Sequence, residues 1–163
     1  MKESNTKIFF YTSWLSNFKE CKIIDTITNL SFTCSEQVYM WQKANFFGDV
    51  DIRQALEDIK VHNPNLSKIL GGQVKNYNEN MWECVRYGFM VYANYLKYSQ
   101  NPDLAQKLLS TKDKVLVEAS PSDLVWGIGL GENQDISILD DEKNWRGRNL
   151  LGESLMRVRI LLT

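Results

Sequence analysis

The sequence is poor in the residues that most catalytic and metal sites require. It has one histidine, His62, and three cysteines, none of them in a CxxC or zinc-like spacing. Ser-His-Asp triads, Cys-His dyads and histidine-rich metal sites are therefore poorly supported. No GxGxxG or P-loop pattern is present, and strands and helices do not alternate as a Rossmann sheet requires. Carboxylates, lysine, arginine and aromatic rings remain as the groups that could carry chemistry.

Long apolar runs and an excess of charge are also missing. No stretch approaches the roughly 18 apolar residues of a membrane span, and the N-terminal MKESNTKIFFY has no signal-peptide pattern. The 19 basic and 20 acidic side chains argue against general nucleic-acid coating. The odd cysteine count favours reduced thiols. We therefore expect a soluble cytoplasmic protein with no membrane contact and no obligate protein partner.

Apolar periodicity predicts a mainly α fold with a few short strands. No repeat or linker interrupts the 163 residues, so we expect one domain over residues 1–163. The clearest helix runs from about Met81 to Tyr98, with Asn80 and Glu83 resembling a capping box. Ser35 is expected to cap a helix that reaches Phe47. The other expected helices cover about 49–59, 64–71, 102–109 and 149 onward, and the expected strands cover 7–11, 22–28, 31–33 and 114–119.

The most informative segment is SPSDLVWGIGL, from Ser120 to Leu130. Asp123 stands three residues before Trp126, and Gly127 follows directly. A carboxylate, an indole and a backbone without side chains suit a phosphorylated, nucleoside-like ligand. An aspartate here is also typical of a turn or a helix N-cap, so both interpretations remain open.

A second polar cluster, NWRGRNLLG, precedes the last helix. Arg146 and Arg148, with the free N–H groups of a helix beginning near Asn149, could hold a phosphate. The alternative is a basic loop that neutralises the acidic residues before it.

Glu36 is the second carboxylate of interest. It lies in the first turn of its helix and shares a face with Lys43, two turns later. Either the two groups line one side of a cleft, or Glu36 only complements the helix dipole. Trp82 is either a core residue or a wall of the same site. Two carboxylates, an ammonium and aromatic rings fit hydrolysis through a cationic sugar transition state.

Several ordered motifs resemble the NADAR family, also called YbiA-like proteins. The motifs cover nearly the whole chain: WLSNF, CSEQVYMWQKANFF, MWECVRYGFM, the L-x-x-T segment, LVEASPSDLVWGIGL and WRGRNLLGESLMRVR. The resemblance implies a compact helical YbiA-like domain that hydrolyses ribosyl N-glycosidic bonds without a metal or cofactor. Glu36 and Asp123 are the expected catalytic residues. The expected substrate-binding residues are Lys43, Trp82, Trp126, Gly127, Arg146, Arg148 and Asn149.

The resemblance implies two substrate classes. One is ADP-ribosylated guanine in nucleic acid such as DNA, from which ADP-ribose is released. The other comprises early phosphorylated riboflavin-biosynthesis intermediates, which release ribose 5-phosphate. Gln37 and Ile128 stand where the bacterial riboflavin type often has a histidine and an acid, and this favours the first class. A non-catalytic module that binds ADP-ribose or NAD and a protein-interaction domain remain as rival interpretations.

Overall fold

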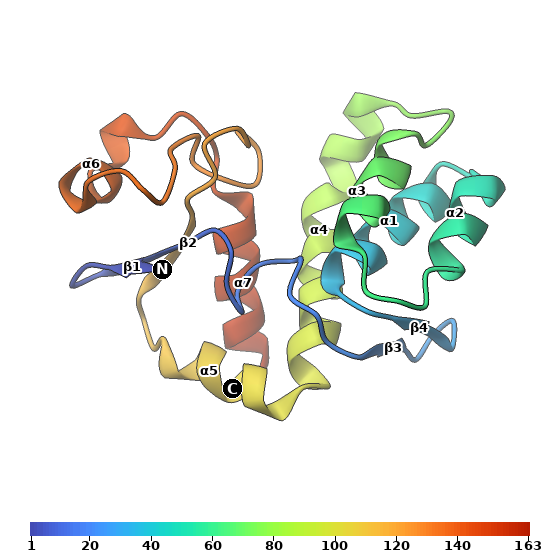
Figure 1. Cartoon of the computed structure of the whole chain (residues 1–163), viewed down its shortest axis with the longest axis horizontal. Coiled ribbons are helices and arrows are strands. Elements are labelled where there is room, and N and C mark those ends of the chain that lie inside the picture. Colours follow the sequence, from blue (N-terminus) through green and yellow to red (C-terminus); the bar gives the residue numbers. More distant parts are fainter. The chain divides into compact units, whose positions relative to one another are not determined.

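Helices are the predominant regular elements of the structure, a computed structural model that describes residues 1–163. This confirms the mainly α class with a few short strands. The chain forms two compact units, each described by itself below. Unit 1 comprises Met1–Ser16 and Asp103–Thr163, and unit 2 comprises Asn17–Pro102. In the colours of Figure 1, unit 2 is the light-blue to yellow-green part of the chain.

Unit 2 is helical apart from one hairpin, in which β3 (Ile23–Asp25) pairs antiparallel with β4 (Leu30–Phe32). Helix α1 is the centre of this unit, because it packs against the other three helices. Figure 1 shows α1 beside α2, α3 and α4. The helices are α1 (Ser35–Phe46), α2 (Val50–Glu57), α3 (Pro64–Gly72) and α4 (Glu79–Ser99).

Unit 1 is built on a three-stranded sheet in the order β1-β2-β5. Strand β2 pairs antiparallel with β1 and parallel with β5. Helix α7 packs on β5 (Figure 1). The strands are β1 (Lys2–Glu3), β2 (Lys7–Phe10) and β5 (Val115–Glu118). The helices are α5 (Pro102–Ser110), α6 (Ile136–Asp140), a 3-10 turn (Glu142–Asn144) and α7 (Leu150–Leu161).

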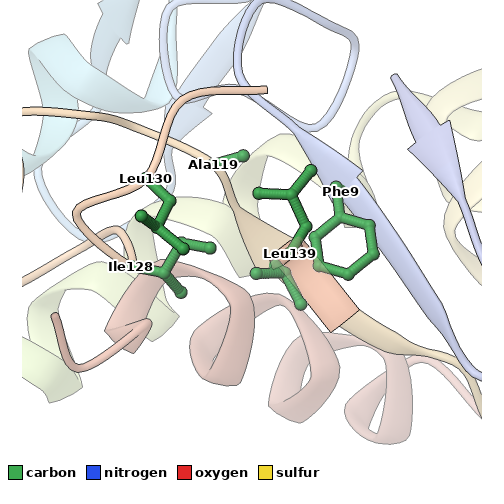
Figure 2. Close-up of a cluster of buried hydrophobic side chains, with 6 residues drawn as sticks. Phe9, Ala119, Ile128, Leu130 and Leu139 are labelled. Atoms are coloured by element: carbon green, nitrogen blue, oxygen red, sulfur yellow. The ribbon is translucent and has the colours of Figure 1, made fainter. Parts of the chain in front are cut away.

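An apolar cluster anchors the glycine-rich loop of unit 1. Phe9 of β2 and Leu139 of α6 lie together in it, and Ile128 and Leu130 of the loop join them (Figure 2). Ile128 and Leu130 alternate with Gly127 and Gly129, so two apolar side chains fix a segment that is otherwise bare backbone. Burial of such side chains stabilises by about 1.5–3 kcal/mol each. The loop is therefore held in place by the core.

Two predicted helix caps are wrong. The N-cap of α1 is Cys34, and Ser35 is the first helical residue, with its hydroxyl 3.3 Å from the Asn17 carbonyl oxygen. Helix α4 begins at Glu79, two residues earlier than a cap at Asn80 would allow. Its N-cap is Asn78, whose side chain accepts a hydrogen bond from the Met81 N–H. The Ser35 hydroxyl bonds to Asn17 instead of capping α1, and in α4 an equally good cap two residues earlier took the predicted place.

None of the helices combines the length and the apolar composition that crossing a membrane requires. The three thiols, Cys21, Cys34 and Cys84, are not paired with one another.

Candidate functional site

In unit 1 the two polar segments identified in the sequence lie against each other. The successive N–H groups of residues 146–151 all donate to carbonyl oxygens of residues 124–128. The Leu150 and Leu151 N–H groups donate to Val125 and Trp126, each at 3.1 Å. The first two N–H groups of α7 are therefore not free for a phosphate, and that part of the predicted cradle is wrong.

Asp123 forms a turn and still presents one carboxylate oxygen. Its Oδ1 accepts from the Val125 N–H at 2.9 Å and from the Trp126 N–H at 2.7 Å. Both hydrogen bonds fall on the same oxygen, and Oδ2 has no hydrogen-bond partner in the chain. The side chain is half-buried, as is Trp126. The turn interpretation is thus confirmed, and one oxygen remains for chemistry.

Two glycines are required where these segments cross. A Cβ on Gly147 would lie 2.2 Å from the Gly127 carbonyl oxygen and 2.8 Å from Leu124 Cα. A Cβ on Gly127 would lie 2.9 Å from Ser120 Cβ and 3.0 Å from the Asp123 carbonyl oxygen. Gly127 is buried, and its lack of a side chain lets the backbone of the loop pass close to Ser120 and Asp123.

Asn149 fastens the start of α7 to strand β5. It has φ of 56°, in the left-handed region that asparagine tolerates better than most residues. Its Oδ1 accepts from the Glu118 N–H and its Nδ2 donates to the Leu116 carbonyl, both at 2.9 Å. Arg146 and Arg148 lie exposed just before it, and Arg146 forms no ion pair. The amide of Asn149 already holds the backbone, and its contact with substrate stays a prediction.

In unit 2, Lys43 lies among aromatic rings at the end of α1. Its Nζ donates to the Gly71 carbonyl of α3 at 2.8 Å. The same atom is 4.4 Å from the ring centroid of Tyr77 and 5.8 Å from that of Trp82. Burial lowers the pKa of Lys43, and the nearby Arg86 charge lowers it further. The Lys43 ammonium therefore loses its proton at a lower pH than that of a surface lysine.

Trp82 and Tyr39 connect Lys43 to Glu36. The Trp82 ring is 5.4 Å from that of Tyr39, and only 4% of the Trp82 residue is exposed. Glu36 is likewise buried, with 6% of the residue exposed. Burial raises the pKa of Tyr39, and the Glu36 charge raises it further. The structure therefore brings Glu36, Lys43 and Trp82 into one neighbourhood, in which Trp82 also packs against Phe46, Phe47 and Phe89.

Three charged residues near these sites were not predicted. Arg86 lies one turn after Trp82 on the same face of α4, a spacing that could have drawn attention to it. Arg86 pairs with Glu79, the first residue of that helix. Glu118 is a buried carboxylate at the end of β5, with 7% of the residue exposed. Its position directly before the Asp123 loop was the available signal.

Neither a metal-binding cluster nor the cavity of unit 2 involves the predicted site residues. No group of three or more His, Cys, Asp and Glu side chains gathers where it could hold a metal ion. A cavity of about 300 Å³ is lined by the β3–β4 hairpin and residues after α2, including Cys21, Phe32 and Lys60. None of the predicted site residues lines it.

Comparison with known proteins now gives the family. The NADAR domain model matches residues 2–163. The chain belongs to the NADAR family. The match runs through both units, and it confirms the resemblance seen in the motifs.

Relatives and a solved structure extend this NADAR assignment. The chain is 38% identical over 157 residues to "N-glycosidase R617" of Acanthamoeba polyphaga mimivirus, covering 93% of this chain and 86% of that protein. It is 32% identical to "Riboflavin biosynthesis protein PYRR, chloroplastic" of Zea mays, over 93% of this chain but 24% of that protein. The NMR structure of YbiA from E. coli matches with a TM-score of 0.75 and 26% identity, over 99% of this chain and 87% of that one. The YbiA-like fold is thereby confirmed, and the names of the relatives support a glycosidase.

Proposed function

We propose that this NADAR protein is a metal- and cofactor-independent N-glycosidase that releases ADP-ribose from ADP-ribosylated guanine in nucleic acid. The observation that carries this proposal is the cluster in unit 2. A half-buried ammonium (Lys43) lies 5.8 Å from the Trp82 ring centroid, and a buried carboxylate (Glu36) stands one turn before Tyr39, whose ring packs on the same indole. Such groups suit a reaction in which a sugar becomes cationic while an aromatic base departs. The R617 relative, named an N-glycosidase, supports the same reaction class.

Hydrolysis requires one bond to break and one to form at the ribose C1′. The C1′–N bond breaks, its electron pair leaves with the base, and a water oxygen bonds to C1′. Either Glu36 or Asp123 takes the proton of the water, and its carboxylate stabilises the developing sugar cation. The departing base takes a proton from the other carboxyl group in its protonated form, and the proton removed from the water later returns to that group through solvent, which completes the balance. The pH profiles of the Glu36→Gln and Asp123→Asn variants show which of the two residues acts as the base and which as the acid.

Unit 1 contributes the Asp123 carboxylate and groups that bind and orient the substrate. Asp123 presents Oδ2, since its other oxygen is held by the turn. Trp126 supplies a half-buried aromatic face, and Gly127 keeps the backbone beside it free of a side chain. The exposed Arg146 and Arg148 attract phosphate, and Asn149 holds the start of α7 in place. Phosphate binding here rests on the guanidinium groups and not on the N–H groups of Leu150 and Leu151.

The maize relative favours a second candidate, because its name places it in riboflavin biosynthesis. In that case the same residues would release ribose 5-phosphate from a phosphoribosyl pyrimidine. We further propose the cytoplasm as the location, which the unpaired state of all three cysteines supports.

The test presents both substrate classes to the same preparation. Purified protein is incubated with guanine-ADP-ribosylated DNA and, separately, with a phosphoribosylaminopyrimidine, and products are followed by mass spectrometry. We expect free ADP-ribose from the first. Release of ribose 5-phosphate alone would transfer the assignment to the second candidate. Tight binding of ADP-ribose with no product from either substrate would identify a binding module instead.

A further inference from the structure

Arg86 is a buried guanidinium with an unusual set of partners. Only 6% of the residue is exposed, yet its Nη2 pairs with Glu79, a carboxylate whose side chain is 64% exposed. Its Nε lies 3.0 Å from a Glu83 oxygen but has no partner in hydrogen-bond geometry. A buried N–H donor without an aligned acceptor costs free energy. Arg86 therefore has binding capacity that the chain itself does not use fully.

Lys43 is a second cation that interacts with both Arg86 and Glu79. The Arg86 charge lowers the pKa of Lys43, and the Glu79 charge opposes this effect. Two cations held near each other repel, and an anion close to both relieves that repulsion. The carboxylate of Glu79 fills this role in the present structure.

Glu79 is held by Tyr77 as well as by Arg86, and its side chain is largely exposed to water. The Tyr77 hydroxyl donates to Glu79, and the Tyr77 ring faces Lys43 Nζ at 4.4 Å. Glu79 begins α4 and can turn into water, where a carboxylate is well solvated. A phosphate has more charge and more acceptor oxygens than a carboxylate, and it matches the fork of a guanidinium. An incoming phosphate therefore has the advantage over Glu79.

We propose that Arg86 and Lys43 form an anion site for a phosphate of the substrate, and that Glu79 occupies Arg86 as an internal competitor until the phosphate displaces it. This inference rests on the proposed function only for the identity of the substrate. It adds Arg86 as a specificity-determining residue, because an unphosphorylated nucleoside cannot displace Glu79. The Trp82 ring, one turn from Arg86 on α4, forms the adjacent wall.

The test measures binding without turnover. Isothermal titration of ADP-ribose and of ribose 5-phosphate is performed with the wild type, Glu79→Gln, Arg86→Gln and Arg86→Lys, with adenosine as the unphosphorylated comparison. Removing the competitor by Glu79→Gln should tighten phosphate-ester binding by about threefold to tenfold. Arg86→Gln should weaken it by about tenfold or more, with partial recovery in Arg86→Lys. Adenosine binding should not respond to Glu79→Gln.

The matched control is Asp51→Asn, which removes an exposed, ion-paired carboxylate of the same unit. A change of long-range charge alone would make this variant tighten binding as much as Glu79→Gln does, and that result would overturn the proposal. Weaker or unchanged binding in Glu79→Gln, or no binding of either phosphate ester by the wild type, would also overturn it. A gain of affinity cannot come from misfolding. Intact anion binding without glycosidase activity would contradict only the proposed function.

Discussion

The two units present their predicted site residues by different means. In unit 1 a loop carries them, and its shape is fixed by backbone hydrogen bonds between residues 124–128 and 146–151. In unit 2 helices α1 and α4 carry the predicted residues, of which Glu36 and Trp82 are buried and Lys43 is half-buried beside aromatic rings. The loop offers one partly exposed carboxylate oxygen, whereas the helices offer buried charge. This difference indicates that unit 1 depends on backbone fit and unit 2 on the electrostatics of burial.

Asp123→Asn should have the largest effect and tests the role of unit 1. The Asn Oδ1 can still accept from the Val125 and Trp126 N–H groups, so the turn and the fold should remain. The carboxylate charge is lost, and kcat should fall by about 100-fold to 10,000-fold. Steady-state kinetics with a thermal melt measures both properties. Asp103→Asn, an exposed carboxylate of the same unit, is the control; equal rates for Asp123→Asn and wild type would remove Asp123 from the mechanism.

Gly147→Ala tests whether the loop depends on backbone fit. The new methyl group would meet the Gly127 carbonyl at 2.2 Å, where no side chain can move aside. We expect a loss of about 1–3 kcal/mol in the free energy of unfolding, together with reduced activity. Urea unfolding gives the first quantity. The matched change Gly88→Ala in α4 meets no atom within 4 Å and should be neutral or stabilising by up to about 1 kcal/mol. Equal effects of the two changes would contradict the comparison.

Lys97→Met tests the buried charge of unit 2 through its dependence on pH. Lys97 in α4 has no exposed surface, and burial lowers its pKa to about 8 from an ordinary value of 10.5. Between these values the unfolded chain binds more protons than the folded protein. The Lys97 contribution to the free energy of unfolding therefore rises with pH, by at most about 1.4 kcal/mol per pH unit.

The measurement is the difference in unfolding free energy between Lys97→Met and wild type, from about pH 7 to about pH 9.5. Subtraction removes the titration of the groups that do not interact with Lys97; the thiols of Cys21 and Cys34 do interact with it, so the difference reports Lys97 together with these neighbours. We expect Lys97→Met to be more stable at neutral pH and to lose this advantage as the pH rises past 8. A difference that does not vary with pH would show that Lys97 titrates normally.

Local sequence signals were sufficient for the main helices. The apolar spacing through Trp82 and Leu96 predicted α4, and Pro64 followed by Gly71 and Gly72 framed α3. They failed at the caps, since Asn78 and Asn80 are equally good caps by residue type. Only tertiary packing determines at which of them the helix begins.

The site was predictable by residue type and less so by arrangement. Asp123 and Glu36 were selected because they stand next to unusual local patterns, and their catalytic role stays a prediction. That residues 146–151 would bond to residues 124–128 was not readable, because backbone hydrogen bonds between distant segments leave no residue-specific signal. The pairing of Arg86 with Glu79 was missed for another reason. Its seven-residue spacing spans two helical turns, beyond the one-turn pairs that helix patterns reveal.

The most direct test of the account is a double-mutant cycle on ADP-ribose release from guanine-ADP-ribosylated DNA. The values of kcat/KM are compared for wild type, Glu36→Gln, Asp123→Asn and the variant with both changes. If Glu36 and Asp123 both act in the proposed glycosidic cleavage, each single change lowers kcat/KM by about 100-fold or more, and the combined variant falls little further. A single variant that keeps the wild-type rate, or losses that multiply in the combined variant, would contradict the account.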